Sequence, residues 1–274
     1  MNIIKASGEI VEFNSNKLKL SLERSGASPT EIEEILTAVH NNLYENIGTK
    51  EIYQKAYDLL NKKSSIAAVK YKLKKAIMEL GPTGYPFEQL IAKLLQYQGY
   101  NTEVGVIING KCISHEIDVI ANRKDQYIMV ECKFHNKPGT KSDVKVPLYI
   151  NSRFWAVKNS NNFNGRGVSF DFGWVVTNTR FSEDAIKYGS CAGLKLVSWD
   201  YPKKGNLREW IEVSGFHPIT CLENLKRVEI EFLLDNNIVL ARELNDQITI
   251  LEGLHIEPKR LSSLVHELKQ IVNI

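Results

Sequence analysis

In the first 80 residues, two short apolar runs are followed by apolar positions at helical spacing. A turn signal, Ala6-Ser7-Gly8, is flanked by apolar residues and predicts a β-hairpin; these residues are Ile3, Ile4, Ile10, Val11 and Phe13. The later apolar residues recur every three or four positions, as in a helix with one buried face. We therefore expect a small helical domain with a β-hairpin lid. Its helices should begin at the capping residues Asn14 or Ser15, Ser28, Thr49 and Ser65.

The sequence Gly81-Pro82-Thr83-Gly84 is the clearest break in this pattern, because neither glycine nor proline continues a helix comfortably. After it, the apolar stretches predict the order helix, strand, strand, strand, helix, strand, helix, strand. Strands mixed with helices predict an α/β fold, in which helices cover both faces of a mixed sheet. The expected strands are residues 101–108, 116–121, 126–133, 173–177 and 194–199, and the two later helices are residues 141–158 and 182–191.

From about residue 205 the pattern is helical again. It predicts one helix over residues 222–234 and a last helix over residues 261–271. This region faintly resembles helix-hairpin-helix units, so a minor-groove binder and a packing or dimerisation element both remain open. We therefore expect three domains, which span residues 1–82, 83–204 and 205–274.

Composition places the chain among ordinary globular proteins, with 43% hydrophobic and 24% charged residues in 274 positions. No apolar run approaches the roughly 20 residues that a membrane-spanning helix needs. The N-terminus lacks the apolar region and cleavage site of a signal peptide. The four cysteines are scattered without a C-x-x-C pair, which fits a reducing compartment. We expect a cytoplasmic protein without a membrane partner.

The formal net charge of +3 is unevenly distributed along the chain. Basic residues outnumber acidic ones between positions 123 and 158, and such a local excess can meet nucleic-acid phosphates. Lys145 and Arg153 are the two positions that we expect to face DNA phosphate, with plain surface charge as the alternative. The basic residues of the segment are Arg123, Lys124, Lys133, Lys137, Lys141, Lys145, Arg153 and Lys158.

Charged residues interrupt two apolar strands of the central domain. Side chains alternate between the faces of a strand, so Glu131 and Lys133 should project to the same side. Asp118 can join them if its strand pairs alongside. Burying such charges is costly unless they are paired or hold a metal ion. A surface salt bridge between Glu131 and Lys133 is the alternative interpretation.

Carboxylate oxygens are the ligands that Mg²⁺ or Mn²⁺ prefers, so we expect the ion at Asp118 and Glu131. The backbone carbonyl of Cys132 lies between Glu131 and Lys133 and could also face the ion. Lys133 could neutralise charge in the transition state or orient the attacking water. Glu116 shares a face with Asp118, and a metal or water ligand and a solvated residue are equally compatible there.

This stretch resembles the PD-(D/E)XK nuclease superfamily, especially its Mrr-like restriction endonuclease branch. Asp118 matches the aspartate of the motif, Glu131-Cys132-Lys133 matches E-x-K, and Glu88 matches an acidic residue that often adds a metal contact. The resemblance spans roughly residues 85–200. It implies a restriction-endonuclease-like α/β/α core that hydrolyses DNA with Asp118, Glu131, Lys133 and Glu88. The motif's proline is absent, since Ile117 precedes Asp118, and this puts the subtype in doubt.

The first 80 residues resemble the ATP-cone, a nucleotide-sensing module. The resemblance rests on Ile4-Lys5-x-x-Gly8-x-x-x-x-Phe13-x-x-x-Lys17-Leu18, on Gly48-Thr49-x-Glu51-Ile52, and on Ala67-Ala68-x-x-Tyr71-x-x-x-Lys75. It implies that Lys5, Lys17 and Lys75 meet phosphates, that Thr49 contacts the nucleotide, and that Tyr71 packs against the base. Ala6 stands where the family usually has a basic residue, so a purely structural cone remains open.

We therefore expect a Mg²⁺- or Mn²⁺-dependent DNA endonuclease, with ATP or dATP as an effector and a homo-oligomeric assembly. By resemblance, restriction or defence against foreign DNA is the expected setting. Two alternatives remain: a nucleotide-responsive DNA-binding protein with an inactive nuclease scaffold, and a nuclease of DNA repair or junction resolution.

Overall fold

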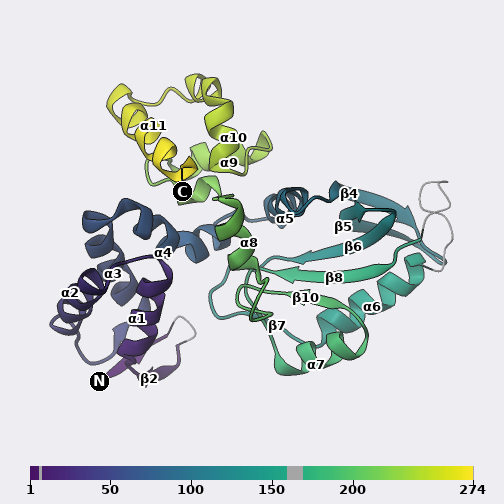
Figure 1. The fold of residues 1–274 in the computed structure, drawn as a ribbon, viewed down its shortest axis with the longest axis horizontal. Helices are drawn as coiled ribbons and strands as arrows, with labels where there is room; N and C mark the ends of the chain where they lie inside the picture. Colours follow the sequence, from purple (N-terminus) through teal and green to yellow (C-terminus); the bar gives the residue numbers. More distant parts are fainter. Residues whose placement is uncertain (6–7, 159–168, 274) are drawn as a thin grey trace.

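The computed structural model describes residues 1–5, 8–158 and 169–273 of the chain. A helical N-terminal part is followed by a central α/β part and by a C-terminal set of helices (Figure 1). Within these residues, no helix is both long enough and apolar enough to cross a membrane.

The N-terminal part combines a small sheet with four helices, and the predicted hairpin is present. Strands β1 (Asn2–Ile4) and β2 (Ile10–Glu12) pair antiparallel, and the turn residues 6–7 lie outside the described residues. A third strand, β3 (Ile47–Gly48), pairs parallel to β1; two residues are too few to give a sequence pattern. The helices are α1 (Ser15–Arg24), α2 (Pro29–His40), α3 (Thr49–Lys63) and α4 (Ser65–Met78).

The helix starts agree with the capping residues to within one position. The Asn14 side chain accepts a hydrogen bond from the Lys17 amide, and Ser28 forms a capping box with Glu31. The prediction that Thr49 caps the third helix is off by one residue, because Gly48 has the extended cap conformation and Thr49 is the first helical residue. These local hydrogen bonds explain why the caps were readable from sequence.

A five-stranded mixed sheet forms the middle layer of the α/β part, in the order β10-β8-β6-β5-β4. Strands β4, β5 and β6 pair antiparallel, whereas β6, β8 and β10 pair parallel. The predicted α/β class with a mixed sheet is therefore confirmed. The strands are β4 (Asn101–Asn109), β5 (Ser114–Arg123), β6 (Gln126–Lys133), β8 (Phe172–Thr177) and β10 (Lys195–Val197).

Helices cover both faces of this sheet, as Figure 1 shows. Helix α5 (Tyr85–Tyr97) packs on the face that carries Val119 and Val130. Helices α6 (Lys145–Lys158) and α7 (Glu183–Cys191) pack on the other face, which carries Ile120 and Met129. Neighbouring residues of β5 and β6 thus alternate between two apolar cores.

Helix α6 begins at Lys145, four residues after the start of the predicted helix over residues 141–158. Lys141–Ser142 instead forms β7, which pairs parallel to β9 (Arg180–Phe181). The Asp143 side chain accepts a hydrogen bond from the Lys145 amide at 2.9 Å, in the manner of a helix cap. A long-range strand contact therefore overrides the local pattern before this cap.

The C-terminal region contains more helices than predicted, although the predicted last helix over residues 261–271 lies within a longer one, Pro258–Val272. A single helix over residues 222–234 is wrong, because Leu222 has extended backbone and the helix starts at residue 227. Leu222 and Leu225 are nevertheless buried, so their apolar character reflects packing of an irregular segment. The helices are α8 (Leu207–Ser214), α9 (Arg227–Asp235), α10 (Ala241–Asp246) and α11 (Pro258–Val272), with 3₁₀ turns at Ile219–Cys221 and Ile248–Leu254.

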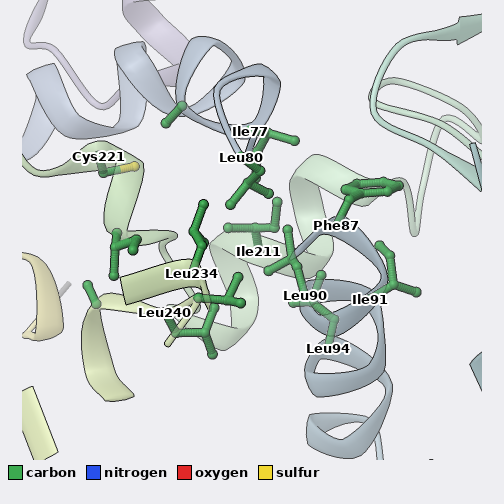
Figure 2. Packing of buried hydrophobic residues seen from close by; sticks show 14 of the residues in the cluster. Ile77, Leu80, Phe87, Leu90, Ile91, Leu94, Ile211, Cys221, Leu234 and Leu240 are labelled. Atoms are coloured by element: carbon green, nitrogen blue, oxygen red, sulfur yellow. The ribbon is translucent and has the colours of Figure 1, made fainter. Parts of the chain in front are cut away.

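One apolar core joins α4, α5, the sheet and the C-terminal helices. Figure 2 shows Ile77 and Leu80, at and beyond the end of α4, beside Leu234 and Leu240 of the C-terminal region and Phe87 of α5. The buried Thr220 hydroxyl also donates to the Ala76 carbonyl at 2.7 Å. The predicted boundaries at residues 82 and 204 remain predictions, and this core runs across both positions.

Candidate active site

The candidate site lies where β5 separates from β6. The last paired residues of these strands are Val119 and Val130, while β5 continues along β4. Beyond that pair, the Cys132 amide donates to Asp118 Oδ2 at 2.6 Å. The Asp118 carboxylate thus replaces a strand neighbour of β6 and lies in the gap between the two strands.

Glu131 and Lys133 project from β6 toward the side of α6, as the alternation predicted. Cys132, between them, packs into the core on the α5 side. Arg153 of α6 donates from Nη1 to Glu131 Oε2 at 2.7 Å, and its Nη2 donates to the Glu116 carbonyl. The Arg153 and Glu131 side chains are 12% and 16% exposed, so this pair is largely shielded from water.

Glu88 reaches the same region from α5, on the other side of the sheet. Burial is the largest cause that raises the pKa of Glu88 to about 7, and the charges of Asp118, Glu116 and Glu131 add to it. A Cβ atom at Gly84 would stand 3.3 Å from Glu88 Oε1, so the chain before α5 closely covers this carboxyl group. Asp118, Glu131 and Glu88 are therefore near enough to interact electrostatically.

The other two carboxyl groups are also shifted. Burial, followed by the Asp118 charge, raises the pKa of Glu131 to about 7, although Arg153 opposes the shift. Burial likewise raises the pKa of Asp118, while the hydrogen bond from the Cys132 amide lowers it. Like charges in a dry site disfavour ionisation, and a bound cation would relieve that cost.

The donor set fits a Mg²⁺-type ion that keeps water or substrate ligands. Among the described residues, no three His, Cys, Asp or Glu side chains converge closely enough to hold a metal ion by themselves. Mg²⁺ is commonly held by one or two carboxylates, and it keeps several waters or phosphate oxygens. The N–H and C=O of one strand residue point to the same edge of the strand. The Cys132 carbonyl therefore points toward the same edge of β6 as the Cys132 amide, which donates to Asp118. The residues available are thus two carboxylates and one carbonyl.

A pocket of about 460 Å³ opens beside these residues. Asn178 follows β8, is fully buried and fixes the backbone of His135, just after the end of β6. Its Oδ1 accepts from the His135 amide at 2.9 Å, and its Nδ2 donates to the His135 carbonyl at 2.7 Å. Asn178 was not among the residues predicted for the site, although a polar residue directly after an apolar strand is a usable signal. The pocket is lined by Pro82, Gly84, Glu131, Cys132, Lys133, Phe134, His135, Asn136, Lys137 and Thr140.

Two residues expected near DNA differ in their surroundings. Lys145 is exposed at the start of α6, which is compatible with phosphate contact or with surface charge. Arg153 fits neither description, because it is largely buried and paired with Glu131. The expected alternative of a Glu131–Lys133 salt bridge is also not formed, since Glu131 pairs with Arg153 instead.

The five residues predicted to bind nucleotide lie in the N-terminal part. Lys17 lies in the first turn of α1 and Thr49 in the first turn of α3. The Lys5 ammonium lies 2.8 Å from the Glu9 carboxylate, and the Lys75 ammonium lies 3.8 Å from the Glu79 carboxylate. The ring of Tyr71 is buried and stacks on the Tyr53 ring, 4.9 Å between centroids.

A pocket of about 520 Å³ does border this part, between α3, α4 and α11. Its lining includes Tyr57, Glu223 and Glu267 but none of the five predicted residues, as far as the described chain extends. Ala6, the departure from the ATP-cone pattern, lies outside the described residues. Nucleotide binding therefore remains a prediction.

Comparison with known proteins identifies a nuclease-like domain in the central part of the chain. Residues 81–201 match the family described as Restriction endonuclease (Mrr_cat), which places a nuclease-like domain of the PD-(D/E)XK superfamily there. Residues 217–272 match the family described as AF1548-like, C-terminal. An uncharacterized protein of Archaeoglobus fulgidus is 34% identical over 183 residues, which are 66% of this chain and 99% of that protein. The chain belongs to the family of this archaeal protein.

Solved structures give the same relationship. The crystal structure of AF1548, a protein of unknown function, is 32% identical with a TM-score of 0.59, and the match covers 70% of this chain and 99% of that chain. Can2 from Sulfobacillus thermosulfidooxidans, in complex with cyclic tetra-adenylate, is 17% identical with a TM-score of 0.35, over 73% of this chain and 52% of that chain. The second likeness is too low to carry an argument.

Proposed function

We propose that the protein is a metal-dependent endodeoxyribonuclease that hydrolyses DNA phosphodiester bonds. The observation that supports this most is the electrostatic interaction of Asp118, Glu131 and Glu88 near the gap between β5 and β6, where Lys133 also interacts with Asp118 and Glu131. Burial and mutual charge raise the pKa of Glu88 and Glu131 to about 7, which a bound cation would reverse.

In this proposal, the ligands of Mg²⁺ or Mn²⁺ are Asp118, Glu131 and the Cys132 carbonyl. Glu88 adds negative charge beside Asp118 and Glu131 and so assists cation binding. A bound divalent ion would supply an acidified water and charge stabilisation at the phosphate. Lys133, exposed at the end of β6, places its ammonium group where it can neutralise developing negative charge. Thr177 donates to the Lys133 carbonyl at 2.7 Å and so fixes the backbone of that residue.

The decisive experiment compares DNA cleavage by wild type with that by Asp118→Asn and Lys133→Met, with Mg²⁺ and with EDTA. Loss of one charge-stabilising group typically costs about 100-fold or more in rate. We expect that loss in both variants and no cleavage in EDTA. Lys187→Met, which changes an exposed lysine of α7, is the matched control and should cleave normally. Wild-type cleavage by Lys133→Met contradicts the assignment.

An inactive nuclease scaffold that binds DNA is the rival proposal, and the Arg153–Glu131 pair is the observation in its favour. An arginine bound to a metal-site carboxylate could take the place of the cation. A binder of this kind leaves DNA uncut with Mg²⁺ as well as with EDTA. If cleavage occurs, linear, nicked, branched and methylated DNA would separate a role in restriction or defence from one in repair or junction resolution.

ATP or dATP as an effector is a further proposal, which rests on the resemblance of residues 1–80 to the ATP-cone. Equilibrium dialysis with ATP tests it directly. We expect binding that falls when Lys17→Ala and Thr49→Ala are combined, since both residues lie at helix starts. Unchanged binding, or none in wild type, contradicts it. Homo-oligomerisation is tested by sedimentation of the same samples.

A further inference from the structure

Helix α6 carries an exposed stripe of large side chains beside the candidate site. Its exposed residues are Lys145, Leu148, Tyr149, Ser152 and Trp155, which we call the α6 outer stripe. Residues three and four positions apart share one face of a helix, so these side chains form one continuous surface. Tyr149 is 62% exposed and Trp155 is 48% exposed, which is unusual for rings of this size.

The stripe is continuous with the candidate site. The Tyr149 ring lies 5.5 Å from the Arg153 guanidinium, and Arg153 in turn binds Glu131. At the far end, the Lys111 amide in the turn after β4 donates to the Ala156 carbonyl at 3.1 Å, which anchors that hairpin to α6. The Lys158 ammonium lies 5.4 Å from the Trp155 ring. A ligand that entered the site could therefore extend along the stripe.

Charge favours a polyanion as the occupant. From residue 145 to residue 158, α6 contains no acidic residue, and because Glu131 neutralises Arg153, its net positive charge comes from Lys145 and Lys158. The nearby Asp143 carboxylate already accepts from the Lys145 amide. A second copy of this chain would bring the same cations into contact with themselves, which is repulsive. Lysines are also depleted at protein–protein interfaces, so a polyanion fits this surface better than another protein copy.

Exposed rings among cations are the features by which proteins hold single-stranded nucleic acid. The faces of unpaired bases are open to stacking, whereas paired bases in a duplex cover one another. Tyr149 and Trp155 lie six residues apart, about 9 Å along the helix axis. Since successive phosphates of one strand advance about 3.4 Å in a stacked form, the two rings would meet different bases.

We propose that the α6 outer stripe binds unpaired bases of a DNA strand and leads that strand to the candidate site. This inference rests on the proposed nuclease function and deepens it, since it names single-stranded or frayed DNA as the substrate form. Tyr149 and Trp155 stack on bases, while Lys145 and Lys158 contact phosphates.

The test is binding in EDTA, where the proposed chemistry is silent. Trp155 is far more exposed than Trp174 and Trp199, so oligo(dT) should quench part of the intrinsic fluorescence. Trp155→Phe should abolish most of that quenching, while Trp210→Phe should retain it. Stacking is worth about 1–3 kcal/mol per base, so Tyr149→Ala and Trp155→Ala should each weaken oligo(dT) binding about fivefold or more. Tyr97→Ala, at the end of α5, is the control, because Tyr97 is 52% exposed but lies outside the stripe, and it should bind normally.

Two further ligands separate stacking from simple charge attraction. An abasic oligomer has the same phosphates without bases, and a blunt duplex has no open base faces. Both should bind more weakly than oligo(dT) at equal ionic strength. Equal or tighter binding of either one overturns the proposal, as does unchanged oligo(dT) binding by both alanine variants. Self-association that Trp155→Ala abolishes would assign the stripe to a second copy instead. Because binding is measured without metal, a failure here is distinct from a failure of Lys133→Met to lose cleavage.

Discussion

At the residue scale, Arg153 is the positively charged partner that compensates the Glu131 carboxylate of the candidate site. Its guanidinium joins the Glu131 carboxylate of β6 to the Glu116 carbonyl of β5, across the gap where the two strands separate. The Arg153 Nε atom is buried without a hydrogen-bond partner among the described residues. Arg153 therefore acts as an internal counter-ion and as a tie between two strands.

Arg153→Met should destabilise the protein, because it leaves the Glu131 carboxylate shielded and unpaired. Breaking a buried pair costs about 3–5 kcal/mol, and we expect about 2–3 kcal/mol here because both groups keep some exposure. Urea unfolding in EDTA measures this loss. If Asp118 and Glu131 hold a cation, Mg²⁺ should restore more stability to Arg153→Met than it adds to wild type.

The matched control is Arg180→Met, which removes a surface ion pair with Asp200. These side chains are 59% and 40% exposed, and such pairs contribute about 0–1 kcal/mol. An equal loss in both variants would show that the Arg153 pair is no more shielded than a surface pair.

The raised pKa of Glu88 gives a pH dependence with a defined sign. The folded protein holds a proton on Glu88 up to about pH 7, whereas the ordinary value is 4.5. The folded state then binds more protons than the unfolded state, so stability falls as pH rises from about 4.5 to 7. Glu88→Gln should remove the part of this fall that Glu88 causes, while Glu131 keeps its own part, and should be the more stable protein at pH above 7.

Thermal unfolding of wild type and Glu88→Gln across that range measures the effect. The gain in Glu88→Gln should stay below about 2 kcal/mol, because Glu88 is only partly buried and solvent screens it. Parallel stability curves for the two proteins would contradict the shift. Adding Mg²⁺ at pH 8 should narrow the difference if the cation neutralises the neighbouring carboxylates.

The sequence predicted the members of this site better than their partners. The alternation of β6 places Glu131 and Lys133 on one side, because that depends on adjacent residues. The Arg153–Glu131 pair joins residues 22 positions apart on a helix and a strand, and no local pattern specifies such a contact. The capture of the Cys132 amide by Asp118 was missed for the same reason.

At the element scale, long strands were predictable and short ones were not. The strand over residues 126–133 agrees with β6 at both ends, because eight residues carry a full apolar pattern. The two-residue strands β3, β7 and β9 exist through pairing with distant chain segments. The α6 start moved for that reason, since β7 takes the residues that local pattern assigns to the helix.

Close packing between α7 and β10 is a second feature at this scale. A Cβ atom at Gly189 would stand 2.6 Å from Leu196 Cδ1 and 2.9 Å from its Cγ, so the whole buried leucine side chain would have to move. Gly189→Ala should therefore destabilise the protein by about 1–3 kcal/mol through overpacking, despite the better helix propensity of alanine.

Chemical unfolding of Gly189→Ala beside Gly48→Ala tests this contact. Gly48 has a φ of −72° and no atom within 4 Å of the added Cβ, so its substitution should cost no more than about 1 kcal/mol, from the poorer N-cap preference of alanine. A neutral Gly189→Ala would mean that the layers of the sheet and α7 separate more easily than the packing indicates.

At the scale of the whole molecule, the nuclease-like sheet shares its core with both flanking regions. Apolar residues of α4 and of the C-terminal helices pack with α5, as Figure 2 shows. The N-terminal part has a second core, which includes Leu22, Ile35 and Leu60. We expect the sheet and the C-terminal helices to unfold together, because their buried surfaces are continuous.

Leu233→Ala tests that coupling. Leu233 is fully buried in α9, and its truncation should cost about 2–5 kcal/mol. All four tryptophans, Trp155, Trp174, Trp199 and Trp210, lie before α9, so tryptophan fluorescence reports on α6, the sheet and α8, and on the core that Trp174 and Trp199 share with the C-terminal helices. If the core is one cooperative unit, Leu233→Ala shifts the fluorescence transition as far as it shifts the transition seen by circular dichroism. Val228→Ala, in the same helix but 75% exposed, should shift neither. A fluorescence transition that stays at the wild-type midpoint while the helical signal is lost earlier would mean that the C-terminal helices unfold as a separate domain.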